Sequence, residues 1–188
     1  MEKKFDILTL GVGCYDVLVR HVPSDIMDQE YVVIDDITTS TGGDALNATV
    51  DLTRLGMKTG FLTVLGNDAW GRSVLNDLQS KGVDTSAIQV REDFRTNVSY
   101  VLIQPDGERH FAIDFAENML PLYNKDIPDE LIASTRHIHA ASCNSLGSMD
   151  DELDVLFRRA HEMGVTTSMD TGFDPTGRWF DRIRETLK

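Results

Sequence analysis

The stretch TSTGGDALNATVDLTRLG, residues 39–56, decides how this sequence folds. Gly42 and Gly43 stand together and are followed by a helical pattern over residues 44–55. Gly56 then supplies a residue that accepts the positive φ of a helix C-terminus. Apolar residues recur at three- and four-residue spacing, which predicts a buried stripe made of Ala45, Ala48, Leu52 and Leu55.

The paired glycines favour either a binding site or a simple helix cap. Without Cβ atoms, Gly42 and Gly43 let a ligand approach the backbone closely, and the first turn of the helix offers free N–H donors. Asp44 and Asn47 are three residues apart and share one side of that turn. Asn47 carries both a donor and an acceptor, which suits a hydroxyl group. Alternatively, this is a glycine turn with Asp44 as the N-cap.

Outward from this stretch, strands and helices alternate, which predicts a mainly parallel sheet covered by helices. The 31–40 strand and a hairpin, 96–104 with 108–115 around Pro-Asp-Gly, interrupt that rhythm. They are expected to form a small sheet standing off the main body. The other predicted strands are 5–13, 59–66, 136–142 and 165–170, and the other predicted helices are 68–82, 126–135, 150–164 and 175–188.

The composition narrows the class of protein. The 188 residues are 41% hydrophobic and 26% charged, with a net charge of −13. A packed core is expected, and the acidic surface argues against a nucleic-acid partner. Two cysteines, Cys14 and Cys143, indicate neither a disulfide framework nor a zinc site. The sequence predicts no membrane span and no signal peptide, so we expect a cytoplasmic protein without a membrane partner.

Three further patterns concern chemistry. GVGCYD, residues 11–16, resembles a dinucleotide-binding loop, but Asp16 stands where the third glycine would be, so we reject that interpretation. Asp16 follows a strand end, where its carboxylate either accepts two sugar hydroxyls or serves a turn. His137 and His139 share a strand face, and core or edge histidines are favoured over a metal site. No P-loop or G-x-S-x-G segment occurs.

Taken in order, five segments resemble the motifs of the ribokinase-like, or PfkB, carbohydrate and nucleoside kinases. The second segment is similar to the glycine-pair signature of that family, and the third is similar to its G-x-D-x-x-G stretch. The segments are LGVGCYDVLV (10–19), TGGDALNATVDLTRLG (41–56), TVLGNDAWG (63–71), DGERHFAI (106–113) and SMDTGFDPTGRW (168–179).

The resemblance implies a ribokinase-like three-layer α/β/α sandwich with a small β-sheet lid near residues 14–40 and 95–115. The implied activity is transfer of the γ-phosphate of ATP, accompanied by Mg²⁺, to a sugar-like hydroxyl. The resemblance also implies that Asp16, Gly42, Gly43 and Asn47 hold the substrate, while Asp44 serves as a cap or as a substrate contact. It further supports a homodimer formed through the lid.

The late motifs of the family, G-A-G-D with its catalytic base and N-x-x-E near magnesium, do not occur in these 188 residues. The resemblance therefore implies that the general base and the anion hole lie beyond Lys188, and no catalytic residue is assigned within the chain. We expect an N-terminal portion of a kinase domain, truncated before its C-terminal half and inactive alone. The alternative is a non-catalytic sugar-binding or regulatory module.

The identity of the acceptor is less constrained by the sequence. Arg109 is a candidate substrate contact, although surface positions are more typical for it and for Arg20 and Arg95. Ribose, fructose, a keto-deoxy acid and a nucleoside stay open, and we favour an unphosphorylated sugar.

Overall fold

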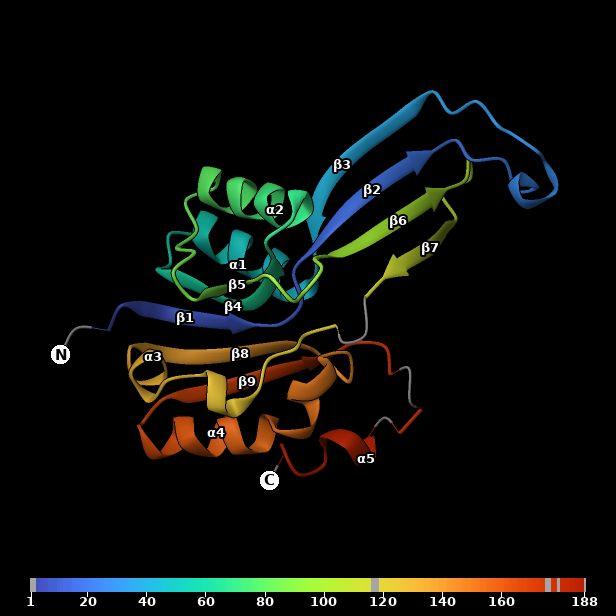
Figure 1. The fold of residues 1–188 in the computed structure, drawn as a ribbon. Helices are drawn as coiled ribbons and strands as arrows, with labels where there is room; N and C mark the ends of the chain where they lie inside the picture. Colours follow the sequence, from blue (N-terminus) through green and yellow to red (C-terminus); the bar gives the residue numbers. More distant parts are fainter. Residues whose placement is uncertain (1–2, 116–118, 175–176, 179, 188) are drawn as a thin grey trace.

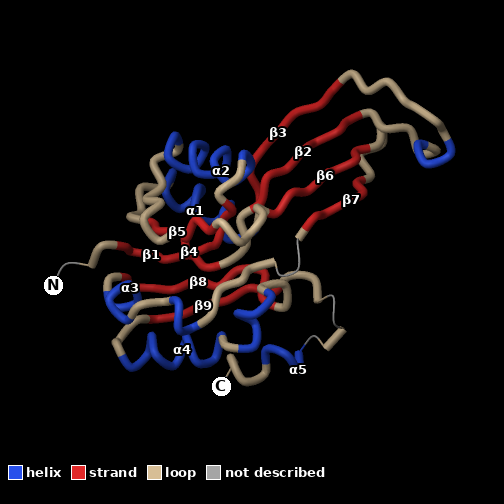
Figure 2. The backbone as a smooth tube through the Cα atoms, viewed as in Figure 1, coloured by secondary structure: helices blue, strands red, loops and turns tan. Residues whose placement is uncertain are grey.

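The main body of the protein is a five-stranded parallel sheet. The computed structural model describes residues 3–115, 119–174, 177–178 and 180–187. The strands follow the order β5-β4-β1-β8-β9 across the sheet (Figure 1, Figure 2). In the central strand, Leu10 lies opposite Leu62 on one side and Ala140 on the other. The strands are β1 (Phe5–Leu10), β4 (Thr59–Gly66), β5 (Ile88–Arg91), β8 (Thr135–Cys143) and β9 (Thr166–Thr171).

Helices cover both faces of this sheet, which confirms the predicted three-layer α/β/α arrangement. Helices α1 (Asp44–Arg54) and α2 (Ala69–Ser80) lie on one face. Helices α3 (Asp129–Ala133) and α4 (Leu153–Glu162) lie on the opposite face (Figure 1). Three short 3-10 turns also lie within the described ranges: η1 (Ile26–Asp28), η2 (Asn124–Asp126) and η3 (Gly147–Asp151).

The helix expected over 175–188 is described only in part. Its described portion is α5 (Phe180–Ile183). Both expected ends, Pro175 and Lys188, lie outside the described residues. Residues 177–178 lie outside any helix and residues 184–187 form turns, so the helix is shorter than expected within the described residues.

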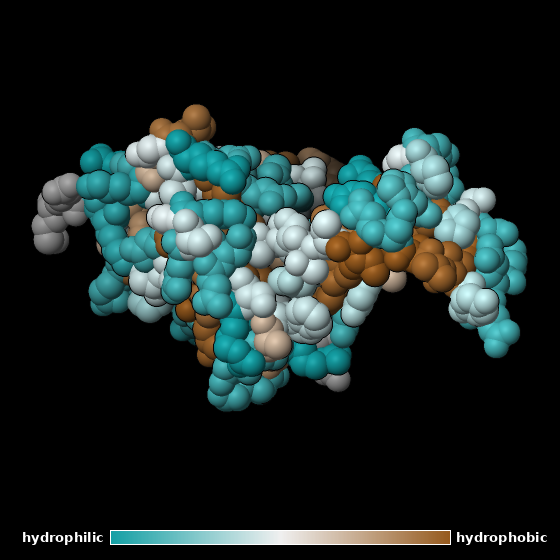
Figure 3. All heavy atoms as spheres, turned by 90° about the horizontal axis from the view of Figure 1, so that it is seen from above, coloured by the Kyte–Doolittle hydropathy of each residue, from teal (hydrophilic) through white to brown (hydrophobic). Residues whose placement is uncertain are grey.

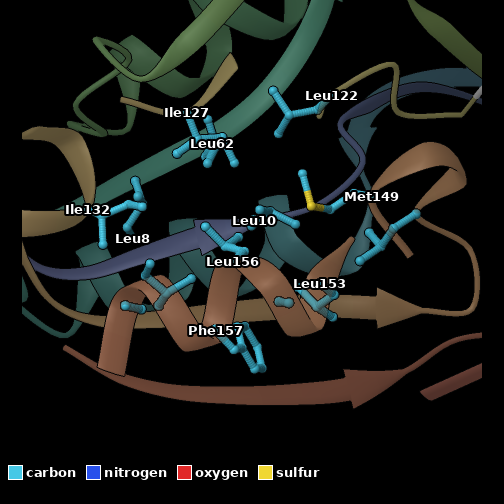
Figure 4. Close-up of a cluster of buried hydrophobic side chains, with 14 of the residues drawn as sticks. Leu8, Leu10, Leu62, Leu122, Ile127, Ile132, Met149, Leu153, Leu156 and Phe157 are labelled. Atoms are coloured by element: carbon cyan, nitrogen blue, oxygen red, sulfur yellow. The ribbon is translucent and has the colours of Figure 1, made fainter. Parts of the chain in front are cut away.

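The larger hydrophobic core lies between the sheet and α4. Leucines of β1 and β4 face this side, and α4 presents Leu153, Leu156 and Phe157 to them (Figure 4). The smaller core lies under α1 and α2 and is built around Phe61, Leu65 and Leu78. Because both faces of β4 are covered, every residue from Thr59 to Gly66 is buried, as a strand inside a parallel sheet requires.

The buried face of α1 differs from the predicted stripe. The helix buries Ala45, Leu46, Thr49 and Val50, whereas Leu55 lies past the helix end and is 80% exposed. The spacing of hydrophobic residues does not predict the buried face of α1, because the polar Thr49 belongs to the core. Its hydroxyl donates to the Ala45 carbonyl at 2.6 Å and also meets the Thr9 hydroxyl of β1. A satisfied hydroxyl can be buried at little cost.

A second sheet of four strands stands away from the main body and forms the lid (Figure 1). Its order is β3-β2-β6-β7, with β2 and β6 parallel and the other pairs antiparallel. The small separate sheet was predicted, but strand β2 was not, and β3 lies later than the expected 31–40. Strand β5 of the main sheet was also missed. The lid strands are β2 (Cys14–Arg20), β3 (Asp36–Gly42), β6 (Asn97–Ile103) and β7 (Arg109–Asp114).

The helices within the described ranges are all too short or too polar to cross a membrane.

Candidate functional site

A cavity of about 290 Å³ lies where the lid meets the main body. It opens beside the carboxyl ends of β1 and β8, the place where parallel α/β sheets usually bind ligands. Each part of the wall comes from a different element. The segment after β1 and the start of α1 contribute Val12, Gly43 and Asp44, the lid contributes Cys14, Asp16, Ser99, Phe111 and Ile113, the segment after β7 contributes Phe115 and Met119, and the β8 end contributes Ser142 and Ser145.

Asp16 is held in this cavity by its neighbours on the lid. The Cys14 thiol donates a hydrogen bond to Asp16 Oδ1 at 3.3 Å. A Cβ atom at Gly42 would overlap Asp16 Oδ2, so the missing side chain of Gly42 makes room for this carboxylate. Burial raises the pKa of Asp16 above its ordinary value, and the bond from Cys14 opposes that rise. The carboxylate therefore lies partly desolvated at the cavity wall.

Gly43, rather than Asp44, occupies the N-cap position of α1, so the N-cap interpretation of Asp44 was wrong. Gly43 has a φ of 104°, and a Cβ atom there would overlap the carbonyl oxygen of Val12. Only glycine fits both the backbone angle and the space. Asp44 is the first residue of the helix, and its carboxylate accepts a hydrogen bond from the Ser142 hydroxyl across the cavity.

The structure separates two sequence-predicted site residues, Asn47 and Arg109, from the others. Asp16, Gly42, Gly43 and Asp44 come together, with Gly42 behind the Asp16 carboxylate. Asn47 is exposed on α1 and is not among the residues lining this cavity.

Arg109 starts β7 and pairs with Ile103, opposite Arg20 on β2. It therefore lies four residues along the lid from the row that contains Asp16 and Ser99, roughly 13 Å at 3.3 Å per residue.

The cavity wall that the structure describes contains none of the catalytic groups implied by the resemblance, because these are expected beyond Lys188. The described part of the chain ends at Leu187, and Lys188 itself lies outside the described residues. The expectation of a general base and an anion hole beyond Lys188 thus stays a prediction. What the structure describes is the wall built by the lid, α1 and the β8 end.

Three serines of the cavity were not chosen from the sequence. Ser99 lies opposite Asp16 in the lid register, so strand alternation was a usable signal once β2 was known. Ser145 follows the predicted strand 136–142, where the sequence allows a pocket residue but favours an ordinary loop residue, and the structure places it in the wall. Ser142 has a φ of 60°, and its amide donates to Asp170 Oδ1 at 2.6 Å. No sequence pattern predicts that backbone conformation. It occurs where the register between β8 and β9 shifts.

The sequence favours packing over ligand contact for Phe94, Phe111 and Phe115, and the structure divides them between two places. Phe94 packs against the larger core, as expected. Phe111 and Phe115 instead line the cavity from the lid side. The cavity wall therefore combines carboxylates and hydroxyls with aromatic rings, a composition suited to a small polyhydroxylated ligand with an apolar face.

Asp68, in the third motif, has a structural role. Its Oδ1 accepts from the Gly71 amide at 2.7 Å and caps α2, and its Oδ2 accepts from the Thr96 amide at 2.8 Å. Burial alone would raise the pKa of Asp68, but these amides and the Thr96 hydroxyl outweigh it and leave the pKa below its ordinary value. This carboxylate fixes the start of α2 to the segment that enters β6.

His137 and His139 lie on one face of β8, as predicted, and share a partner. His137 Nε2 lies 2.7 Å and His139 Nδ1 2.8 Å from the hydroxyl of Ser168 on β9. Burial and the neighbouring His139 lower the pKa of His137. In the ranges that the structure describes, no group of three or more His, Cys, Asp or Glu side chains could hold a metal ion.

Comparison with known proteins gives one family. The model described as pfkB family carbohydrate kinase matches residues 14–187. An ATP-dependent ribose-1-phosphate kinase of Halopiger xanaduensis is 32% identical over 76% of this chain and 45% of its own. A probable fructokinase-5 of Arabidopsis thaliana is 27% identical over 73% of this chain and 42% of its own.

Solved structures share the fold. A fructokinase of Xylella fastidiosa superposes with a TM-score of 0.79 at 23% identity, covering 96% of this chain and 56% of that one. The same fructokinase with bound ATP gives a TM-score of 0.76 at 21% identity, covering 97% and 58%. The ribokinase-like α/β fold is thereby confirmed. The chain spans about half the length of the relatives it matches.

Proposed function

Because this chain belongs to the pfkB family of carbohydrate kinases, we propose that the complete gene product phosphorylates a hydroxyl group of a sugar bound in the cavity beneath the lid. One observation carries the proposal. The family signature at Gly42 and Gly43 and the Asp16 carboxylate meet at one wall of a cavity at the carboxyl ends of the central strands. Asp16 and the glycine pair belong to two separate segments of the sequence. The pairing of β2 with β3, in which Cys14 lies opposite Gly42, brings these segments together.

In this proposal, Asp16 accepts hydrogen bonds from substrate hydroxyls. A carboxylate oxygen accepts such bonds strongly when it is partly removed from water, and burial places Asp16 in that condition. Gly42 lets the carboxylate sit back from the cavity, and Gly43 allows α1 to begin at the wall. Asp44, fixed by Ser142, would contact a second hydroxyl. For Asn47 the structure adds no support.

ATP is the proposed phosphoryl donor, and Mg²⁺ would offset its phosphate charge. The residues that the structure describes do not fit a metal site, since no cluster of three suitable side chains occurs among them. We therefore derive no step through magnesium from this chain. The resemblance places the catalytic base and anion-binding turn in a G-A-G-D segment, which is absent from these 188 residues and is expected beyond Lys188. We propose that the 188 residues bind the acceptor but do not turn it over alone.

A phosphotransfer assay tests the function. The complete gene product, ATP and Mg²⁺ are incubated with a panel of sugars, and ADP formation is followed. Asp16→Asn should weaken acceptor binding about 10- to 100-fold, because it removes a charged hydrogen-bond acceptor worth roughly 1.5–3 kcal/mol. Asp51→Asn, which removes one charge from the exposed face of α1, is the matched control and should behave as wild type.

Each outcome of that assay is informative. Sugar-dependent ADP formation that fails in Asp16→Asn supports the proposal. Sugar binding without any phosphotransfer would instead favour the alternative, a non-catalytic sugar-binding or regulatory module. Turnover by the purified 188-residue chain would refute the proposal that this portion alone is inactive.

We also propose that two copies associate through the lid. Apolar side chains gather on the lid (Figure 3), where Phe111 is 56% exposed and Ile113 is 43% exposed. Phe111 and Ile113 share one face of β7 and would be covered by a second lid. Light scattering should report a dimer that Phe111→Glu weakens. His110→Glu, on the other face of the same strand, is the control. A monomeric wild type would exclude the dimer.

A further inference from the structure

Among the residues that the structure describes, those lining the cavity include acidic but no basic side chains. Asp16 and Asp44 are its ionisable carboxylates, and Lys, Arg and His are absent from the described residues that line it. We infer that the cavity takes an uncharged sugar and discriminates against sugars that carry a phosphate or carboxylate group. This inference rests on the proposed function, since it assumes that the cavity is the acceptor site. It narrows the acceptor by charge rather than by the number of its carbons.

The N-terminus of helix α1 does not offer a free site for an anionic ligand in this cavity. Helix α1 starts at the cavity, and its N-terminus would ordinarily favour a negative group. Asp44 already occupies its first turn and supplies that negative charge. The Asp44 carboxylate is in turn held by the Ser142 hydroxyl. A phosphate bound here would lie beside the Asp44 carboxylate, which already occupies the N-terminus of α1.

The raised pKa of the Cys14 thiol indicates that this cavity disfavours an added negative charge. Burial raises the pKa of Cys14, and the negative charge of Asp16 raises it further, as does the more distant charge of Asp44. A thiolate at this position is thus opposed both by loss of water and by like charge. A phosphate or carboxylate group in the same cavity would meet the same two penalties.

Two arginines of the lid, Arg20 and Arg95, are not among the lining residues and have acidic partners. Arg20 donates to Thr38 at 2.7 Å and pairs with Asp36. Arg95 pairs with Asp114 at 3.4 Å. Both pairs are exposed or half-exposed, so their charges are directed to other lid side chains.

Arg109 differs from these two arginines, because its guanidinium carbon lies 6.0 Å from the ring centre of Phe111, a lining residue. Its strand register nevertheless places it at the far end of the lid. A variant of Arg109 therefore tests whether the lid supplies a cation to the cavity.

The apolar wall adds to the discrimination. Phe111, Ile113, Phe115 and Met119 line the same cavity as the carboxylates. The apolar face of a neutral sugar ring can lie against them while its hydroxyls meet Asp16, Ser99 and Asp44. A phosphate dianion against the same side chains would lose water without gaining a partner, which is costly.

Matched pairs of ligands test the inference on the complete gene product. Ribose is compared with ribose 1-phosphate, and fructose with fructose 1-phosphate and fructose 6-phosphate, by titration calorimetry without nucleotide. The neutral member should bind about tenfold more tightly or better, because a like charge near the ligand opposes binding of the anion at a partly exposed site. The preference should diminish at high salt, where exposed charges are screened.

Variants assign the preference to the wall. Asp44→Asn should reduce the ratio of neutral to phosphorylated affinity, whereas Asp51→Asn on the same helix should leave it unchanged. Arg109→Gln should not affect either ligand. Tighter binding of a phosphate ester would overturn the inference, and loss of that binding in Arg109→Gln would assign the phosphate to Arg109. Failure of every pair to bind would overturn it as well.

The two proposals fail in distinguishable ways. Phosphotransfer found only on a phosphorylated sugar would leave the kinase function standing and refute the preference for an uncharged ligand. Binding of neutral sugars without phosphotransfer to any of them would leave the charge preference standing and refute the kinase function. The calorimetric and ADP readouts are independent of one another.

Discussion

Replacing Gly43 by alanine should destabilise the fold strongly, whereas the same change at Gly42 should cost little stability and weaken sugar binding. The difference arises from what a new methyl group would meet. At Gly43 it would overlap the backbone oxygen of Val12 at a φ of 104°. At Gly42 it would overlap only the tip of the Asp16 side chain, which can rotate away from the cavity.

The magnitudes follow from these contacts. For Gly43→Ala, the backbone angle costs about 1–3 kcal/mol and the clash with an immobile carbonyl costs about 1–3 kcal/mol more. The sum, about 4 kcal/mol, corresponds to a fall in Tm of roughly 8–16 °C for a chain of this length. Gly42→Ala should cost about 1 kcal/mol, or roughly 2–4 °C, while displacing the Asp16 carboxylate should lower sugar affinity about tenfold or more.

Thermal unfolding measures the stability of both variants, and calorimetry with the best-binding sugar measures affinity. Gly56→Ala is the control for backbone strain. Its φ is 88°, but nothing lies within 4 Å of the position that its Cβ atom would take. It should therefore show the cost of the angle without a clash, about 1 kcal/mol.

A double-mutant cycle with Asp16→Ala isolates the cause of the affinity loss. If Gly42→Ala acts by displacing the carboxylate, it should have no further effect on sugar affinity once Asp16 is alanine. The reasoning is refuted if Gly43→Ala is no less stable than Gly56→Ala. It is equally refuted if Gly42→Ala binds sugar as tightly as wild type.

Three further predictions concern stability. Asp68→Ala should lose about 2–3 kcal/mol at neutral pH, since two backbone amides lose a charged acceptor; because the pKa of Asp68 is lowered in the fold, the difference from wild type should shrink as the pH falls below its ordinary value of 3.8. Leu46→Ala should cost about 2–5 kcal/mol by chemical denaturation, whereas Leu55→Ala should change stability by less than about 0.5 kcal/mol, and equal losses would contradict the assignment of the buried face. Burial and His139 lower the pKa of His137, so protonation costs stability as the pH falls below about 6.5; His137→Gln should therefore lose less Tm than wild type between about pH 7.5 and 5.5, and a larger loss would contradict this sign.

Local sequence signals predicted much of the main body because its elements are regular and well delimited. Strand β4 was predicted with its observed ends, 59–66, since a continuous apolar run between glycines is typical of a strand buried on both faces. Helix α1 was predicted to within one residue at its end. Strand β5 was missed because its four residues, 88–91, are too few for a pattern to develop.

Properties that depend on register could not be predicted in the same way. Strand β2 was not predicted from the residues, and without it neither the position of Ser99 opposite Asp16 nor the position of Arg109 opposite the end of β2 could be known. The site residue Ser142 depends on a left-handed backbone angle that its residue type does not favour. Such features are set by tertiary contacts, whereas the glycine pair is set by its own missing side chains.

The covalent continuity of the lid with the cavity has a mechanical consequence. Strand β3 runs into α1 with only Gly43 between them, and β2, which carries Asp16, follows β1 after three residues. The Asp16–Gly42 contact thus lies where the two lid strands join the main body. In the function proposed above, a sugar bound at this contact would restrict the angle of the lid, and a second subunit bound to the lid would in turn restrict the contact. In the proposed dimer, the change in acceptor affinity on dimerisation and the change in dimer affinity on acceptor binding would then be equal, since both measure one coupling free energy.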